Sequence, residues 1–125
     1  MPIKGLIAID NALVRRGFRE LVLSDPETEI VGQAEDYPQL VRLAVETNPH
    51  VIVSDLNKLK HPQGRVPGLL SFFAPGKAPP ILTISFALGV EAEHAAAEMG
   101  AVRLLDKMKL AADLVPAIRE LAAKP

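Results

Sequence analysis

The 125-residue sequence contains no cysteine, which excludes a disulfide framework or a thiolate metal site and fits a reducing compartment. Its apolar runs are much shorter than the roughly 18 residues of a membrane-spanning helix, and the N-terminus lacks the pattern of an export signal. Neither sign of charge dominates, because 14 basic residues face 15 acidic ones, so no basic field attracts a nucleic-acid backbone. We therefore expect a cytoplasmic protein that contacts neither membrane nor nucleic acid directly.

Two phosphate-binding motifs of α/β enzymes are also absent. No G-x-G-x-x-G follows the first apolar run, and no G-x-x-x-x-G-K-[ST] occurs, which disfavours dinucleotide and nucleoside-triphosphate enzymes. No histidine or cysteine nucleophile follows a predicted strand either, so a small α/β enzyme is the weakest of three function classes. The hydrophobic content of 49% is enough for one globular domain, which we expect to span residues 1–125.

Short apolar runs alternate with longer segments of helical period, which is the pattern of βα units around a parallel sheet. Most runs are continuously apolar, as strands covered on both faces must be. The predicted strands cover residues 3–9, 29–33, 51–54, 80–84 and 102–105, and the predicted helices cover residues 12–23, 40–45, 92–99 and 110–121. Any helix near residues 69–73 is short, because Pro-Gly pairs flank it. Asp10 and Asp36 are the predicted N-caps of the first two helices.

The pattern predicts a flavodoxin-like α/β fold, a doubly wound five-stranded parallel sheet with strand order 2-1-3-4-5. Ligands of such sheets bind outside the carboxyl ends of the strands, where Asp10, Asp55, Ser85 and Lys107 follow strands one, three, four and five. Strands one and three are neighbours in this order, so their two carboxylates meet, and a cation such as Mg²⁺ would offset their repulsion. The lysine and the serine would complete a pocket for a phosphoryl group carried by one acid, and Asp55 is the predicted nucleophile.

Each of these residues also has a plain structural interpretation. An aspartate after a buried strand most often forms a turn or caps a helix, and Ser85 could cap the helix that Glu91 and Glu93 open. A single lysine is usually a solvated surface residue, so Lys107 is a candidate site residue only because it occurs together with Asp10, Asp55 and Ser85.

Three segments resemble motifs of the response-regulator receiver domain, the CheY-like family, and in particular its NarL/FixJ type. Residues 7–17 (IAIDNALVRRG) are similar to the family segment IADDHALVREG, and residues 49–57 (PHVIVSDLN) to PDVVLLDLxMP. Residues 100–107 (GAVRLLDK) are similar to GAxGYLLK. The resemblance spans essentially the whole chain, and the order and spacing of the three motifs are more specific than any one of them.

The resemblance implies that Asp55 accepts a phosphoryl group from the phosphohistidine of a sensor histidine kinase. It implies that Mg²⁺ is held by Asp10, Asp55 and the main-chain carbonyl of Asn57, that Lys107 pairs with the phosphoryl group, and that Ser85 donates its hydroxyl to that group. Catalysis would be limited to phosphorylation of this aspartate and its reversal.

The resemblance also implies an output, which for this type is transcription through a C-terminal helix-turn-helix domain that binds DNA. Residues 1–125 would then be the N-terminal receiver of a longer regulator. A homodimer would form through the helix at residues 92–99, the strand at 102–105 and the helix at 110–121.

Two departures from the family pattern affect the pocket. The usual pair of acids after the first strand is Ile9-Asp10 here, so one carboxylate is missing and Mg²⁺ binding is expected to be weak. Phe86 follows Ser85 where the family has a small residue, and its ring could obstruct the phosphoryl group. Both departures favour the alternative function, a degenerate receiver that acts as a phosphorylation-independent protein-interaction module.

Overall fold

Five parallel strands form one sheet in the order β2-β1-β3-β4-β5, in a computed structural model that describes residues 2–55, 73, 78–85, 89–98 and 101–123. The strands are β1 (Ile3–Ala8), β2 (Thr28–Ala34), β3 (Val51–Asp55), β4 (Ile81–Ser85) and β5 (Ala101–Asp106). All four pairings are parallel, and β1 lies next to β3 with Ala8 opposite Ser54. The predicted fold class and strand order are confirmed.

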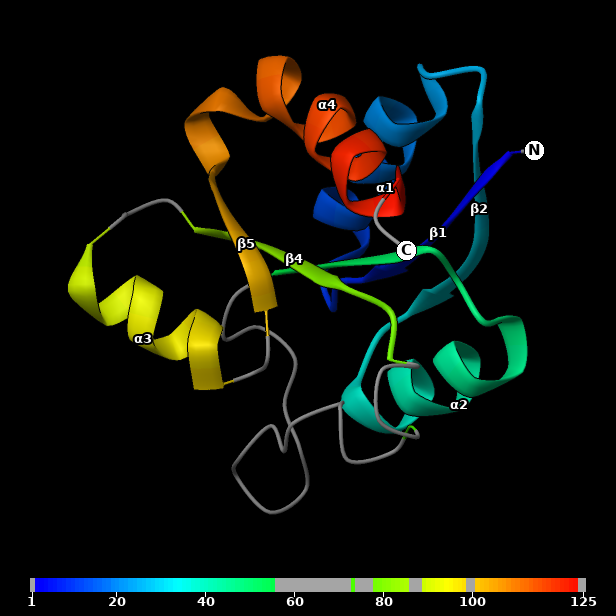
Figure 1. Ribbon diagram of the computed structural model, residues 1–125, viewed down its shortest axis with the longest axis horizontal. Helices are drawn as coiled ribbons and strands as arrows, with labels where there is room; N and C mark the ends of the chain where they lie inside the picture. The colour runs from blue at the N-terminus through cyan, green and yellow to red at the C-terminus, as the bar shows by residue number, and fades with distance from the viewer. Residues whose placement is uncertain (1, 56–72, 74–77, 86–88, 99–100, 124–125) are drawn as a thin grey trace.

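Helices cover both faces of this sheet (Figure 1). They are α1 (Ala12–Leu23), α2 (Tyr37–Thr47), α3 (Val90–Glu98) and α4 (Leu110–Ala123), with a 3₁₀ turn over Lys107–Lys109 before the last. Helices α1 and α4 pack on one face, and α2 and α3 on the other. The short helix expected near residues 69–73 lies outside the described residues, except for Phe73, which packs against the α2 side of the core. None of the helices described is long and apolar enough to cross a membrane.

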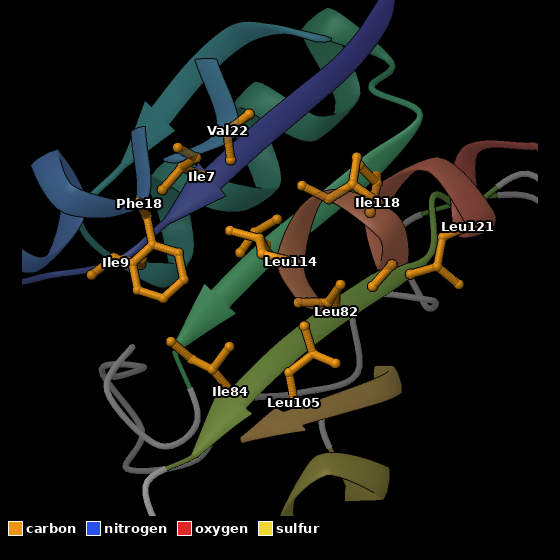
Figure 2. Close-up of a cluster of buried hydrophobic side chains, with 13 residues drawn as sticks. Ile7, Ile9, Phe18, Val22, Leu82, Ile84, Leu105, Leu114, Ile118 and Leu121 are labelled. Carbon is orange, nitrogen blue, oxygen red and sulfur yellow. The ribbon is translucent and has the colours of Figure 1, made fainter. Parts of the chain in front are cut away.

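From Gly5 to Ile9, at the end of β1 and just after it, the chain is buried, and successive side chains point to opposite faces. Ile7 and Ile9 join a large apolar cluster under α1 and α4, where Figure 2 shows Phe18 packed beside Ile9. Leu6 and Ala8 join a second cluster under α2. Because both faces are covered, every position along the strand favours an apolar side chain, which explains the continuous apolar runs in the sequence.

The helix caps differ from the prediction at one of two positions. Asn11 caps α1, because its side-chain oxygen accepts hydrogen bonds from the main-chain N–H groups of Leu13 at 2.9 Å and Val14 at 3.1 Å. The prediction of Asp10 was therefore wrong by one residue, since the cap must directly precede the first helical residue. Asp36 caps α2 as predicted, accepting from the N–H of Gln39 at 2.9 Å.

The possibility that Ser85 caps the following helix is also excluded. Ser85 is the last residue of β4, and α3 begins five residues later at Val90. The carbonyl of Gly89 accepts the first helical hydrogen bond, from the N–H of Glu93 at 2.9 Å, so Gly89 holds the cap position.

Candidate functional site

The site centres on a buried carboxylate at the end of a central strand. Asp55 is the last residue of β3, which lies between β1 and β4, and its side chain is only 6% exposed. The ammonium Nζ of Lys107 lies 3.2 Å from its Oδ2, and the lysine side chain is 12% exposed. Lys107 begins the 3₁₀ turn after β5, so it reaches Asp55 past the end of the intervening strand β4. The strand order therefore brings together two residues that are 52 positions apart.

Asp10 follows the neighbouring strand. The pairing of Ala8 with Ser54 places it two residues beyond the end of β1, beside the end of β3, as the strand order predicted. Its side chain is exposed at the rim of the sheet. Two carboxylates from adjacent strand ends, one buried and one exposed, thus lie at the carboxyl edge of the sheet.

The other predicted site residues are only partly described. Ser85 ends β4 in register with Asp106, which places its main chain at the same edge. Its side chain, together with Asn57 and Phe86, lies outside the described part of the structure.

Ile9 replaces the first acid of the family pattern and belongs to the core. Its side chain is fully buried and lies in the cluster that contains Phe18 and Leu114 (Figure 2). An apolar residue packed in this way adds no charge to the site, so of residues 9 and 10 only Asp10 supplies a carboxylate at the end of β1.

An arginine that the sequence analysis did not single out holds the turn between β1 and α1. Arg15 lies in the first turns of α1, and its Nη1 donates to the carbonyl oxygens of Ile9 at 2.8 Å and Asp10 at 3.4 Å. Its Nη2 lies 3.3 Å from the carboxylate of Glu35, just after β2, and the arginine side chain is 15% exposed. One signal in the sequence pointed to it, because a cation near a helix N-terminus is disfavoured by the helix dipole.

Two hydroxyl groups beside the site are buried without a hydrogen-bond partner. Ser54 precedes Asp55 on β3 and pairs in register with Thr83 on β4, and both residues are fully buried. Neither hydroxyl oxygen makes a hydrogen bond. An unpaired buried hydroxyl costs stability, so these two positions weaken the sheet next to the carboxylate.

A second buried carboxylate lies at the opposite edge of the sheet. Asp25, before β2, accepts hydrogen bonds from Nε and Nη2 of Arg119 on α4, at 2.9 and 2.6 Å. It also accepts from the Glu27 N–H at 3.1 Å and the Thr28 hydroxyl at 3.0 Å. The hydrogen bonds from Arg119 are the main reason that the pKa of the Asp25 carboxyl lies below its ordinary value. This network ties α4 to the start of β2, at the edge of the sheet opposite the site.

The donor set at the carboxyl edge suits a hard divalent cation. Carboxylate oxygens are the ligands that Mg²⁺ prefers, and the Lys107 ammonium beside Asp55 shows that a positive charge is accommodated there. Within the described ranges, no group of three His, Cys, Asp or Glu side chains is arranged for a metal. The two acids Asp10 and Asp55 therefore fit Mg²⁺ with fewer protein charges than a three-acid site.

Comparisons with known proteins agree with this architecture. The chain superposes on a two-component response regulator of the LuxR family from Aurantimonas with a TM-score of 0.82, at 28% identity over 98% of this chain and 86% of that one. The sequence is 29% identical to the transcriptional regulatory protein LiaR of Bacillus subtilis, over 94% of this chain and 54% of LiaR. It is 34% identical to a protein-glutamate methylesterase/protein-glutamine glutaminase of Thiobacillus denitrificans, over 88% of this chain and 31% of that protein. No protein-family model matches the chain.

The parallel sheet with order 2-1-3-4-5 and an acid at the end of β3 define a CheY-like domain of the flavodoxin-like class. The similar sequences and structures identify the family within this class, and they confirm the resemblance seen in the sequence motifs. The chain is a response-regulator receiver domain with relatives of the LuxR type. It spans about half the length of LiaR and about a third of the methylesterase.

Proposed function

We propose that this receiver domain is a phosphorylation-controlled switch of a two-component system, in which Asp55 accepts a phosphoryl group from a histidine kinase. The observation that carries the proposal is the contact of 3.2 Å between the buried Asp55 carboxylate and Lys107 at the carboxyl edge of the sheet. A carboxylate fixed at a strand end beside a cation is suited to attack phosphorus and to retain the product.

In the proposed reaction, a carboxylate oxygen of Asp55 attacks the phosphorus of a phosphohistidine. The new O–P bond forms as the P–N bond breaks, and the imidazole leaves with the bonding electrons and takes up a proton. Lys107 stays beside the acceptor, where its charge offsets part of the roughly two negative charges that the phosphoryl group adds. Ser85, at the end of β4, would donate its hydroxyl to the phosphoryl oxygens.

Asp10 and Asp55, with the main-chain carbonyl of Asn57, are the residues that would hold Mg²⁺. The bound ion would supply positive charge for the phosphoryl oxygens. Because Ile9 contributes no carboxylate, we expect this binding to be weak.

The proposed output is transcription. The relative LiaR is a transcriptional regulatory protein, and the likeness to a LuxR-family regulator points the same way. DNA binding would belong to a further domain, while residues 1–125 would contact the kinase and form a homodimer through α3, β5 and α4. The chain itself would catalyse only its own phosphorylation and dephosphorylation.

One observation favours the second candidate function, a degenerate receiver that binds a protein partner without phosphorylation. The position of the missing acid is filled by a fully buried isoleucine, Ile9, which is packed as core. An interaction module needs the fold, but it does not need the carboxylate that an acid at position 9 would supply.

Intact-mass measurement after incubation with acetyl phosphate and Mg²⁺ tests the proposal. We expect slow, partial addition of one phosphoryl group to the wild type, none to Asp55→Asn, and faster addition to Phe86→Ala, which replaces the aromatic residue that follows Ser85 in the sequence by a small one. Asp113→Asn, which removes a carboxylate from α4, is the matched control and should behave like the wild type.

The outcomes separate the two functions. An unmodified wild type together with a modified Phe86→Ala variant would show that the pocket has the chemistry but is sterically closed, and the interaction module would then be the function. If neither protein is modified, Asp55 is a structural acid and the phosphoacceptor assignment is wrong.

A further inference from the structure

The side chain of Arg15 is placed against the local preference of its helix. Helix α1 has no acidic residue in its first turn, and a cation near a helix N-terminus faces the positive end of the helix dipole. A residue that breaks a local rule is expected to have a compensating role, often at a functional site.

These contacts join the loops that follow two neighbouring strands. Nη1 donates to the carbonyl oxygens of Ile9 and Asp10, which lie beyond the last paired residue of β1. Nη2 lies 3.3 Å from Glu35 in the loop after β2, and the N–H of Glu35 donates to the side chain of Gln39 at 2.9 Å. One guanidinium thus ties the turn that carries Asp10 to the loop that leads into α2.

The planar guanidinium makes this link possible. Its donors form a fixed fork, so contacts to carbonyl oxygens on one side and a carboxylate on the other restrict the turn in two directions. Asn11 restrains the same turn from the helix side, through its bonds to the N–H groups of Leu13 and Val14. Asp10 therefore projects from a main chain that is held before and after it, although its own side chain is exposed.

We propose that Arg15 is a positioning residue for Asp10, and that it holds the β1–α1 turn in the geometry in which this carboxylate can share a Mg²⁺ ion with Asp55. The inference rests on the proposed function, because it takes Asp10 as a metal ligand. With one acid missing at Ile9, the remaining exposed acid depends on its main chain for its position. Residues that orient metal ligands typically contribute about tenfold or more to metal affinity.

The sign of the effect distinguishes positioning from simple charge. Removing a cation near the site would by charge alone strengthen Mg²⁺ binding, since like charges repel. Loss of positioning would weaken it. Arg15→Ala is therefore expected to raise the Mg²⁺ dissociation constant about tenfold. Arg15→Lys, which keeps the charge but cannot form the two-sided link, should give a smaller rise.

The experiment is a Mg²⁺ titration followed by the amide NMR shifts of the β1–α1 turn and of Asp55, which needs no phosphorylation. Arg16→Ala is the matched control, because it removes the same charge from the next position, where the side chain is 73% exposed. Its dissociation constant should equal that of the wild type. The amide spectra of each variant also report whether the fold is intact.

Glu35→Gln provides a second test that keeps Arg15 and its carbonyl contacts. It removes the charged anchor of Nη2, so we expect a rise of a few-fold, while Glu20→Gln, the control on the exposed face of α1, should leave the constant unchanged. Unchanged or lower dissociation constants in both Arg15→Ala and Glu35→Gln would overturn the inference. A wild type whose turn amides do not respond to Mg²⁺ would overturn it too, while the mass measurement on Asp55 decides the proposed function separately.

Discussion

Removing Lys107 should leave the buried carboxylate of Asp55 without its cation and destabilise the fold. At a separation of 3.2 Å and an effective dielectric constant of about 20, the attraction is roughly 5 kcal/mol before desolvation is subtracted. Breaking a buried pair from one side costs about 3–5 kcal/mol. Since 12% of the lysine side chain is exposed, water can partly replace the ammonium, and we expect Lys107→Met to cost about 3 kcal/mol, at the low end of that range.

A double-mutant cycle isolates the pair from the other contacts of the lysine. In an Asp55→Asn background the charge is gone, so Lys107→Met should cost only about 1 kcal/mol, which leaves a coupling free energy of about 2 kcal/mol. Urea unfolding in metal-free buffer, followed by circular dichroism, measures each corner of the cycle. With a slope of roughly 2 kcal/mol per molar urea, Lys107→Met should lower the midpoint by about 1.5 M.

The exposed pair of Arg16 and Glu20 serves as the control for this cycle. Its side chains are 73% and 69% exposed, so its coupling should be about 0.3–0.5 kcal/mol and should disappear in high salt. The coupling between Lys107 and Asp55 should persist in salt, because buried pairs are screened less. A value below about 0.5 kcal/mol would refute the reasoning, since the contact would then be equivalent to an exposed one.

Two further predictions concern α4 and its neighbours. Because the hydrogen bonds from Arg119 lower the pKa of Asp25 in the folded state, the stability that this carboxyl contributes is present above its ordinary value of 3.8 and is lost as pH falls below it. Urea midpoints should therefore fall more between pH 7 and acid pH for the wild type than for Arg119→Leu, and equal falls would contradict the assignment. For the proposed dimer, Arg103→Glu should weaken self-association measured by sedimentation, because it replaces the cation that pairs with Glu120 at 2.6 Å on that face. Arg42→Glu on α2 should not, and a wild type that stays monomeric with and without beryllofluoride would argue against the dimer.

The sequence by itself determined the fold class and which charged residues meet at the carboxyl edge of the sheet. Strands buried on both faces favour apolar side chains at every position, so β1 and β3 were recognisable as continuous runs, with ends that differ from the prediction by one residue. The strand order then placed Asp55 and Lys107 at one edge although they are 52 residues apart. This inference succeeded because the carboxyl ends of all strands in a parallel sheet meet at the same edge.

Only the tertiary structure decided which polar side chains hold the two edges of the sheet, the carboxyl edge with the site and the edge opposite it. The contacts of Arg15 with Glu35, and of Arg119 with Asp25, span 20 and 94 residues and depend on how α1 and α4 rotate and pack on the sheet. Local periodicity identifies the apolar face of a helix, but it does not specify which residue a long polar side chain beside that face will contact. The tertiary structure also decided that Asn11, and not Asp10, caps α1. The exact residue at which the chain leaves β1 is set by the packing of the strand and the helix together.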